Sequence, residues 1–157
     1  MTPFVNTARP RVLVADPDPE TSALLARQLE WSGYDVTTVY NGRDALDVIG
    51  RTRPAAVVLE VKMDVLTGYE VVRQLREDAR NRLMPVIMIS ARAGKLDRDF
   101  AFTVGADDYV KKPFRSAELV ARLAMLLPSD GKPADAKPIA RPGRRQLSPV
   151  PALVASR

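Results

Sequence analysis

Short runs of β-branched and other apolar residues alternate with amphipathic stretches along the first 127 residues, and this alternation constrains the fold more than any other feature. The strand, helix, strand order, at about the length of a βαβ unit, favours a parallel sheet with right-handed crossovers and helices on both faces. The runs are nearly continuous in apolar character, as expected of strands buried on both sides. We therefore predict an α/β fold with strands at residues 12–15 (VLVA), 36–39 (VTTV), 56–59 (AVVL), 86–89 (VIMI) and 108–110 (DYV).

Between these runs, apolar residues recur at helical spacing. Asp18 followed by Pro19 is typical of a helix N-cap and first turn, and Gly33 suits the left-handed position after the same helix. The stretch 100–104 has the weakest helical pattern. The expected apolar faces are Leu24, Leu25 and Leu29; Ala45, Leu46 and Ile49; Val71, Val72 and Leu75; and Leu119, Val120, Leu123, Leu126 and Leu127.

Composition bounds the class of protein. A chain of 157 residues with 46% apolar and 27% charged residues has room for one domain of ordinary size. It has no Cys and no His, which excludes disulfides, thiolate nucleophiles, Ser/His/Asp triads and zinc sites that need those ligands. No window of 18 apolar residues and no secretory signal are present, so we expect a soluble cytoplasmic protein. The lack of Cys and His removes much enzyme chemistry, and we expect that the chain is not an enzyme.

The net charge of +5 is concentrated at the C-terminal end. Residues 128–157 hold six Lys or Arg against two Asp or Glu, which gives +4, together with six prolines and the brief apolar run VPALVA. We interpret this segment as a disordered basic tail, too short and proline-rich for a helix-turn-helix DNA-binding domain. The remainder is nearly neutral, so nothing indicates a basic, nucleic-acid-binding face on the folded part.

Polar side chains follow four of the predicted strands. Asp16 follows the first, Glu60 the third, Ser90 the fourth and Lys112 the fifth. Carboxyl ends of parallel strands meet at one edge of the sheet, where such folds bind their ligands. Carboxylates, a hydroxyl and an ammonium are the groups that a phosphoryl-accepting site needs. The set is close to such a site but incomplete.

The motifs VLVADPDPE, AVVLEVKMDVLTGYEVV, PVIMISA and GADDYVKKPF, in this order and spacing, resemble the response-regulator receiver family (CheY-like) of bacterial two-component signalling. The resemblance implies a flavodoxin-like (βα)5 three-layer sandwich with strand order 2-1-3-4-5. It also implies three parts: residues 1–10 as an N-terminal extension, 11–127 as the receiver domain and 128–157 as the tail.

Carried over position by position, the resemblance assigns roles to five residues. Asp16 matches the first of the family's two metal-binding acids, Ser90 its hydroxyl residue and Lys112 its lysine. Tyr109 matches the aromatic switch, and the bond before Pro113 is expected to be cis.

Two positions depart from the family's pattern. Pro17 stands where the family has its second acid, and Glu60 where it has the phosphoacceptor aspartate. Loss of an anionic ligand should weaken or abolish Mg²⁺ binding, so we expect no metal cofactor, with Asp16 as a residual ligand. The extra methylene of Glu60 should shift its carboxylate toward Ser90 and Lys112 and away from the position for in-line attack. We also expect the Lys62 ammonium to neutralise Asp16 and Glu60 in place of the metal.

Several alternatives stay open. Glu60 is either drift at an unused site or a substitution that fixes an active-like state. Ser90 could instead satisfy backbone groups at the strand end, and Lys112 could be a solvated cation paired with Glu60. Tyr109 could be only a half-buried aromatic with a wet hydroxyl.

The leading hypothesis is a stand-alone atypical receiver, a pseudo-receiver that signals by protein contact without aspartyl phosphorylation. The family docks kinases and effectors on the face of its fourth helix, fifth strand and fifth helix, which we expect to be the partner surface, and a homodimer is compatible with it. We expect neither a DNA-binding domain nor a membrane partner. One alternative is a phosphorylatable receiver in which Asp64 supplies a carboxylate.

Two further alternatives belong to other classes. A small enzyme or nucleotide binder is disfavoured because no Gly-rich phosphate loop follows Ala15. In the other, residues 132–145 of the tail bind nucleic acid or an acidic protein. Ser148, in RRQLSP, resembles a kinase target.

Overall fold

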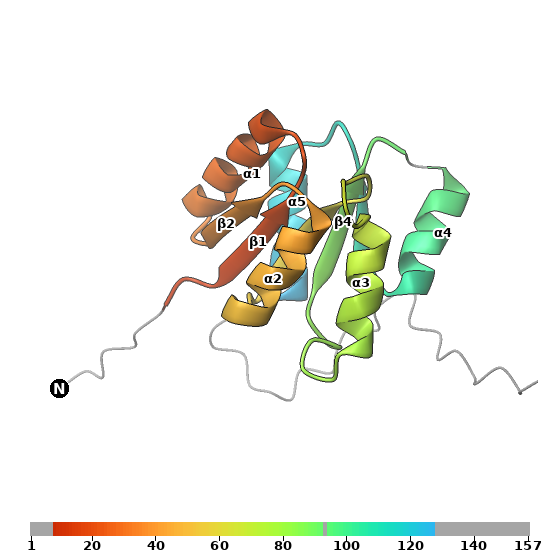
Figure 1. The fold of residues 1–157 in the computed structure, drawn as a ribbon. Coiled ribbons are helices and arrows are strands. Elements are labelled where there is room, and N and C mark those ends of the chain that lie inside the picture. Colours follow the sequence, from red (N-terminus) through yellow and green to blue (C-terminus); the bar gives the residue numbers. More distant parts are fainter. Residues whose placement is uncertain (1–7, 93, 128–157) are drawn as a thin grey trace, which may run out of the picture.

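The computed structural model describes residues 8–92 and 94–127. Strands and helices alternate strictly through this part of the chain (Figure 1). The elements are β1 (Arg11–Ala15), α1 (Pro19–Trp31), β2 (Asp35–Val39), α2 (Gly42–Thr52), β3 (Ala56–Glu60), α3 (Gly68–Glu77), β4 (Val86–Ser90), α4 (Lys95–Val104), β5 (Asp108–Lys111) and α5 (Ser116–Leu126).

The strands form one parallel sheet in the order β2-β1-β3-β4-β5, which confirms the predicted order. The register aligns the carboxyl ends, because Ala15 pairs with both Val39 and Leu59, and Glu60 pairs with Ile89. After β2 the chain returns to the other side of β1 to form β3, so the topological switch point lies between β1 and β3. Folds of this type place functional groups at the carboxyl ends of the strands next to the switch point.

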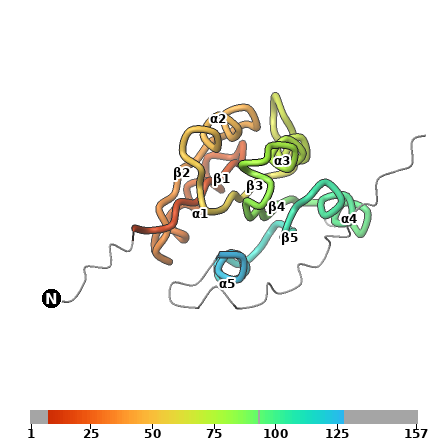
Figure 2. The backbone as a smooth tube through the Cα atoms, turned by 90° about the horizontal axis from the view of Figure 1, so that it is seen from below, coloured from red at the N-terminus to blue at the C-terminus, as the bar shows by residue number. Residues whose placement is uncertain are grey.

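Helices cover both faces of the sheet, which gives the expected three layers (Figure 2). One buried cluster joins the sheet to α2, α3 and α4, and it includes Ala45, Val71, Val72, Leu75, Met88 and Ala101. The other joins the sheet to α1 and α5, and it includes Val14, Leu25, Leu29, Val58, Leu119 and Leu123. The central strands are buried on both sides, and this explains their continuous apolar sequences.

Boundary residues end the elements where their chemistry predicts. The Asp18 carboxylate accepts hydrogen bonds from the Glu20 and Thr21 backbone N–H groups, so it is the N-cap of α1. Gly33, just beyond the end of α1, has φ +99°, the left-handed conformation that glycine adopts most easily. Thr67 and Glu70 form a reciprocal capping box at the start of α3.

Two expectations need correction. Leu24 was placed on the core face with Leu25 and Leu29 but is 49% exposed, because it points about 100° away from the adjacent Leu25 around the helix axis. The helix α4 spans Lys95–Val104, so it begins before the weak stretch 100–104.

Trp31, the last residue of α1, is 95% exposed.

Within the described residues, none of the helices is both long enough and apolar enough to span a bilayer. The N-terminal extension up to residue 7 and the tail at 128–157, with Ser148 and residues 132–145, lie outside the described residues.

Candidate functional site

Asp16 follows β1 and is almost completely buried, at 1% exposure. Its Oδ1 atom accepts a hydrogen bond from the Asp18 backbone N–H at 2.9 Å, across the turn that contains Pro17. Its backbone carbonyl accepts a bond from the Ser22 hydroxyl at 3.1 Å. The Asp18 backbone thus holds the Asp16 carboxylate at the sheet edge, and Ser22 of α1 holds the Asp16 backbone.

Glu60 ends β3 and is 6% exposed. Its Oε1 atom accepts a hydrogen bond from the Lys62 backbone N–H at 3.2 Å. The helix α3 begins directly against this strand end, since a Cβ on Gly68 would lie 2.4 Å from the Glu60 carbonyl oxygen. Only glycine fits at this position, and the close packing fixes the backbone that carries Glu60.

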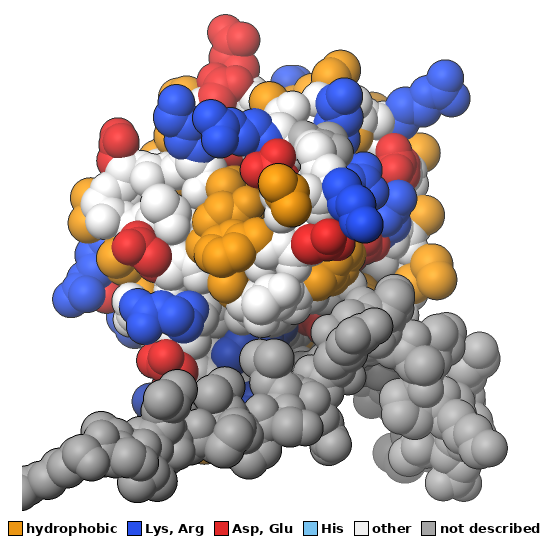
Figure 3. All heavy atoms as spheres, turned by 90° about the vertical axis from the view of Figure 1, so that its right-hand side faces the viewer, with side chains coloured by type: hydrophobic (Ala, Val, Ile, Leu, Met, Phe, Trp, Pro, Cys, Tyr) orange, Lys and Arg blue, Asp and Glu red, His pale blue; other side chains and the backbone are white. Residues whose placement is uncertain are grey.

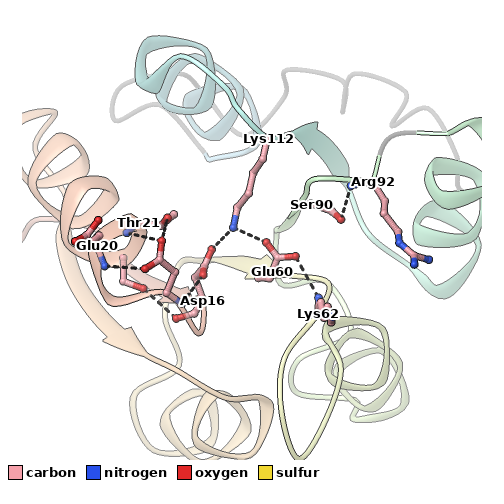
Figure 4. Close-up of polar contacts among 10 residues, drawn as sticks. Asp16, Glu20, Thr21, Glu60, Lys62, Ser90, Arg92 and Lys112 are labelled. Carbon is pink, nitrogen blue, oxygen red and sulfur yellow. Dashed lines mark hydrogen bonds and ion pairs between the residues drawn. The ribbon is translucent and has the colours of Figure 1, made fainter.

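Lys112 brings these two carboxylates together (Figure 4). Its Nζ atom lies 2.6 Å from Asp16 Oδ2 and 2.6 Å from Glu60 Oε2. The contact with Asp16 is a hydrogen bond, whereas the contact with Glu60 is an ion pair whose angles do not suit a hydrogen bond. The Lys112 backbone N–H donates to the Ser90 carbonyl at 2.8 Å, and the bond to Pro113 is cis. One ammonium thus joins the ends of β1, β3 and β5.

Electrostatics favour the charged form of this lysine. Burial lowers the pKa of Lys112, but the hydrogen bond to Asp16 and the close carboxylates of Asp16 and Glu60 outweigh burial and raise it above its ordinary value. The ammonium is therefore charged throughout the physiological range.

The expected role of Lys62 is wrong. Its side chain is exposed, and only its backbone N–H contacts Glu60. Lys112 has the position that was expected for the Lys62 ammonium, since it bridges both carboxylates. Lys62, in the loop after β3, is exposed to solvent, whereas Lys112, just after β5, reaches the pocket.

Ser90 and Tyr109 contact the loop after β4 rather than the carboxylates. The Ser90 hydroxyl accepts a hydrogen bond from the Arg92 backbone N–H at 3.0 Å, which is the structural role left open for it. The Tyr109 hydroxyl donates to the Arg92 carbonyl, and its ring is buried at 1% exposure. The alternative of a half-buried ring with a wet hydroxyl is therefore wrong. The Arg98 guanidinium lies 5.8 Å from the centre of this ring.

The side chains present fit a divalent metal poorly. Pro17 has no ligand atom, and Asp18 uses its carboxylate to cap α1. The remaining pair, Asp16 and Glu60, already holds the Lys112 ammonium. Among residues 8–92 and 94–127, no three Asp or Glu side chains gather into a group that could bind a metal. Asp64, the alternative carboxylate, is exposed.

This arrangement of strand order, buried acids and bridging lysine agrees with a match to the response regulator receiver domain over residues 12–124. The chain belongs to the receiver domain family. It is therefore a signalling module of two-component systems, as the sequence motifs predicted.

The receiver's relatives support the assignment. The transcriptional regulatory protein PrrA of Mycobacterium leprae is 46% identical over 129 residues, which cover 82% of this chain and 54% of PrrA. The chain thus spans about half the length of the curated relatives it matches. Among solved structures, the chemotaxis response regulator CheY4 of Vibrio cholerae has a TM-score of 0.73 and 27% identity, with 76% of this chain and all of CheY4 covered.

A third relative was solved with a metal. The receiver domain of the sensor histidine kinase PA1611 from Pseudomonas aeruginosa is 32% identical, has a TM-score of 0.69, and has a magnesium ion coordinated in its active site cleft. The alignment covers 74% of this chain and 95% of that domain.

Sequence reasoning missed one buried ion pair of this receiver. Arg76 on α3 donates to the carbonyls of Gly105, Arg82 and Met84 at 2.8–3.0 Å and contacts the Asp107 carboxylate at 3.1 Å. Asp107 also accepts from the Val86 backbone N–H at 2.9 Å. An acid just before a predicted strand could have indicated such a contact, but its partner lies 31 residues away in sequence.

Proposed function

We propose that this receiver is a pseudo-receiver: it signals through protein contact, and aspartyl-type phosphorylation takes no part in its signal. The observation that carries the proposal is the bridge from Lys112 to Asp16 and Glu60, with both distances at 2.6 Å. In this pocket an internal ammonium supplies the positive charge that a bound metal would otherwise bring.

The geometry around Glu60 disfavours attack on a phosphoryl donor. One of its oxygens is engaged by Lys112 and the other by a backbone N–H. An attacking carboxylate needs a free oxygen in line with the leaving group, so both contacts would have to break first. A donor anion would also meet two acidic side chains whose shared cation, Lys112, is already engaged.

The oxygen ligands available in this pocket should bind Mg²⁺ only weakly. Mg²⁺ demands near-octahedral oxygen ligands and gives up its waters reluctantly. Here Asp16 would be the only acid of the first strand end available to it, and its Oδ2 atom bonds Lys112 while Oδ1 bonds the Asp18 backbone. A metal would have to displace the lysine to bind.

We infer that partners dock on the face of α4, β5 and α5. The side chains of Leu96 and Phe100 on α4 are 82% and 51% exposed, and Met125 on α5 is 71% exposed. Figure 3 views the α4 side of the molecule, where hydrophobic side chains reach the surface among charged ones. Phe100 packs edge-to-face on Tyr69 of α3 at 4.7 Å, so the exposed apolar surface of α4 extends toward α3.

Contacts through the loop after β4 join the pocket to that face. Ser90 and Tyr109 both bond Arg92, and Arg98 of α4 lies over the Tyr109 ring. With Lys112 fixed on Glu60, these contacts have no phosphoryl group to respond to. A single arrangement of the docking face is the expected consequence, and its regulation would come from partner availability.

The test is incubation with acetyl phosphate and Mg²⁺, followed by mass analysis of the intact protein. A double variant, Pro17→Asp with Glu60→Asp, restores the family's acids and is the positive control. The proposal expects a phosphoryl adduct on the double variant and none on the wild type. A wild-type adduct would refute it, and an Asp64→Asn variant would then show whether that side chain carries the group.

A further inference from the structure

A shallow apolar groove lies along the exposed side of α1, away from the pocket and from the α4 face. Its walls are Leu24, Arg27, Gln28 and Trp31, and we call these four residues the α1 groove. Leu24 is 49% exposed and Trp31 95% exposed, although both are large apolar side chains. Leu24 and Trp31 both line this groove, so the two side chains form one exposed apolar patch, the kind of surface that marks binding sites.

We propose that the apolar run at residues 150–155 (VPALVA) docks in the α1 groove, with Leu153 against the Trp31 ring. This run is the one apolar stretch of the tail, which is otherwise rich in proline and charge. A valine, a leucine and a second valine supply side chains of the size that the groove can cover.

The tail begins within reach of the groove. Helices α1 and α5 pack on the same face of the sheet, and both run from the carboxyl ends of the strands back toward the amino ends. The last turn of α5 and the Trp31 end of α1 therefore lie at the same end of the molecule. About 20 residues separate Leu127 from the apolar run, and a flexible linker of that length spans about 25 Å on average. Helix α1, with 13 residues, is about 20 Å long.

The charges agree with this placement. The last turn of α1 contains Glu30 and no basic residue, and a helix C-terminus has a partial negative charge. Arg144 and Arg145 precede the apolar run by five to six residues in sequence. Their guanidinium groups would lie near Glu30 when the run is docked, although Arg27 of the groove wall is itself basic.

The size of the groove favours a tethered segment over a second copy of the chain. Four residues of a single helix cannot supply the roughly 800 Å² per partner that stable association between separate molecules requires. A segment of the same chain needs far less, because its effective concentration is in the millimolar range. The groove therefore fits an intramolecular ligand.

Trp31 is the only tryptophan of the chain, so its fluorescence reports on the groove directly. In the 157-residue chain we expect emission at shorter wavelength, and acrylamide quenching weaker by about twofold or more, than in the same chain with Leu153→Asp. Leu24→Gln, a change in the groove wall, should raise quenching in the same way. Ile139→Asp makes the matched apolar-to-acid change in the tail outside the run and should leave Trp31 protected.

Three outcomes would overturn the proposal. Equal quenching of wild type and Leu153→Asp would mean that the run does not cover Trp31. Equal loss of protection in Ile139→Asp would remove the specificity for residues 150–155. Protection that increases with protein concentration would assign the groove to a second copy. Far-UV circular dichroism of each variant establishes that the domain itself is unchanged.

Discussion

Lys112 and Glu60 approach each other across the ends of β5 and β3, with Nζ 2.6 Å from Oε2, and the same ammonium lies 2.6 Å from Asp16. Both acids are almost fully buried, whereas the Lys112 side chain is 24% exposed. Two buried carboxylates that lose their shared cation have no substitute from solvent. The stability of the domain should therefore depend on this lysine.

Replacing the lysine tests that dependence. Lys112→Met should lower the free energy of unfolding by about 2–3 kcal/mol, less than for a fully buried pair because solvent partly screens the bridge. Urea unfolding measures the change. Lys111→Met, at the exposed neighbouring position, should stay within about 0.5 kcal/mol of wild type. If Lys112→Met also changes the free energy of unfolding by no more than about 0.5 kcal/mol, the bridge does not stabilise the domain.

The raised pKa of Lys112 predicts how this contribution varies with pH. The folded state holds the proton more tightly than the unfolded state, so the contribution is complete below about pH 10, the unfolded pKa. It is lost as pH rises through the folded-state pKa. The stability difference between wild type and Lys112→Met should therefore shrink above pH 10. Tyr34 and Tyr69, whose pKa values are raised chiefly by burial, titrate in both proteins and cancel in the difference. A difference constant up to pH 11.5 would mean that Lys112 does not stabilise the folded state through its charge.

The path of the chain could be predicted because each local signal agreed with the fold. The five apolar runs match the strands to within one residue at either end, and Asp18 caps α1 as its position before Pro19 indicated. The site was harder, because contacts between side chains depend on loops. The resemblance placed Lys112 in the pocket and left its pairing with Glu60 open, but Lys62 also follows a strand end, and spacing alone did not show that Lys112 bridges both carboxylates. Leu24 likewise shares the helical spacing of Leu25 but not its direction.

Gly68 lets α3 begin directly against the end of β3, so a side chain at residue 68 should push α3 away from the backbone that carries Glu60. Gly68→Ala places a Cβ against the Glu60 carbonyl and against Val61, so it should cost about 1–3 kcal/mol in free energy of unfolding. Gly50→Ala is the matched control, because nothing lies within 4 Å of its Cβ in α2. That change should stabilise by about 0.5–1 kcal/mol through helix propensity. Destabilisation of equal size in both variants would exclude the close approach of α3 as the cause.

Magnesium should have little effect on the stability of the wild type. The pocket would have to release Lys112 before it could hold the ion, so Mg²⁺ at millimolar concentration should leave the thermal midpoint within about 1 °C. The double variant Pro17→Asp with Glu60→Asp should bind the ion. If its Kd for Mg²⁺ is one hundredth of the magnesium concentration, binding raises its free energy of unfolding by about 2.7 kcal/mol. Calorimetry with magnesium and after chelation measures the shift. A wild-type midpoint that rises by several degrees would show that Asp16 and Glu60 accept the ion.

The Arg76 and Asp107 pair should contribute more to stability than any surface ion pair of the domain. Asp107 is buried, and its Oδ2 atom accepts from Arg76 and from the Val86 backbone N–H, so it joins α3 to the start of β4. Asp107→Asn keeps the shape but removes the charge that compensates the guanidinium, at a cost of about 2–4 kcal/mol. Asp47→Asn removes the same charge from an exposed pair with Arg43 at 3.9 Å and should cost less than about 0.5 kcal/mol. Chemical denaturation of both variants compares them, and similar small losses would mean that solvent reaches Arg76 when its partner is neutral.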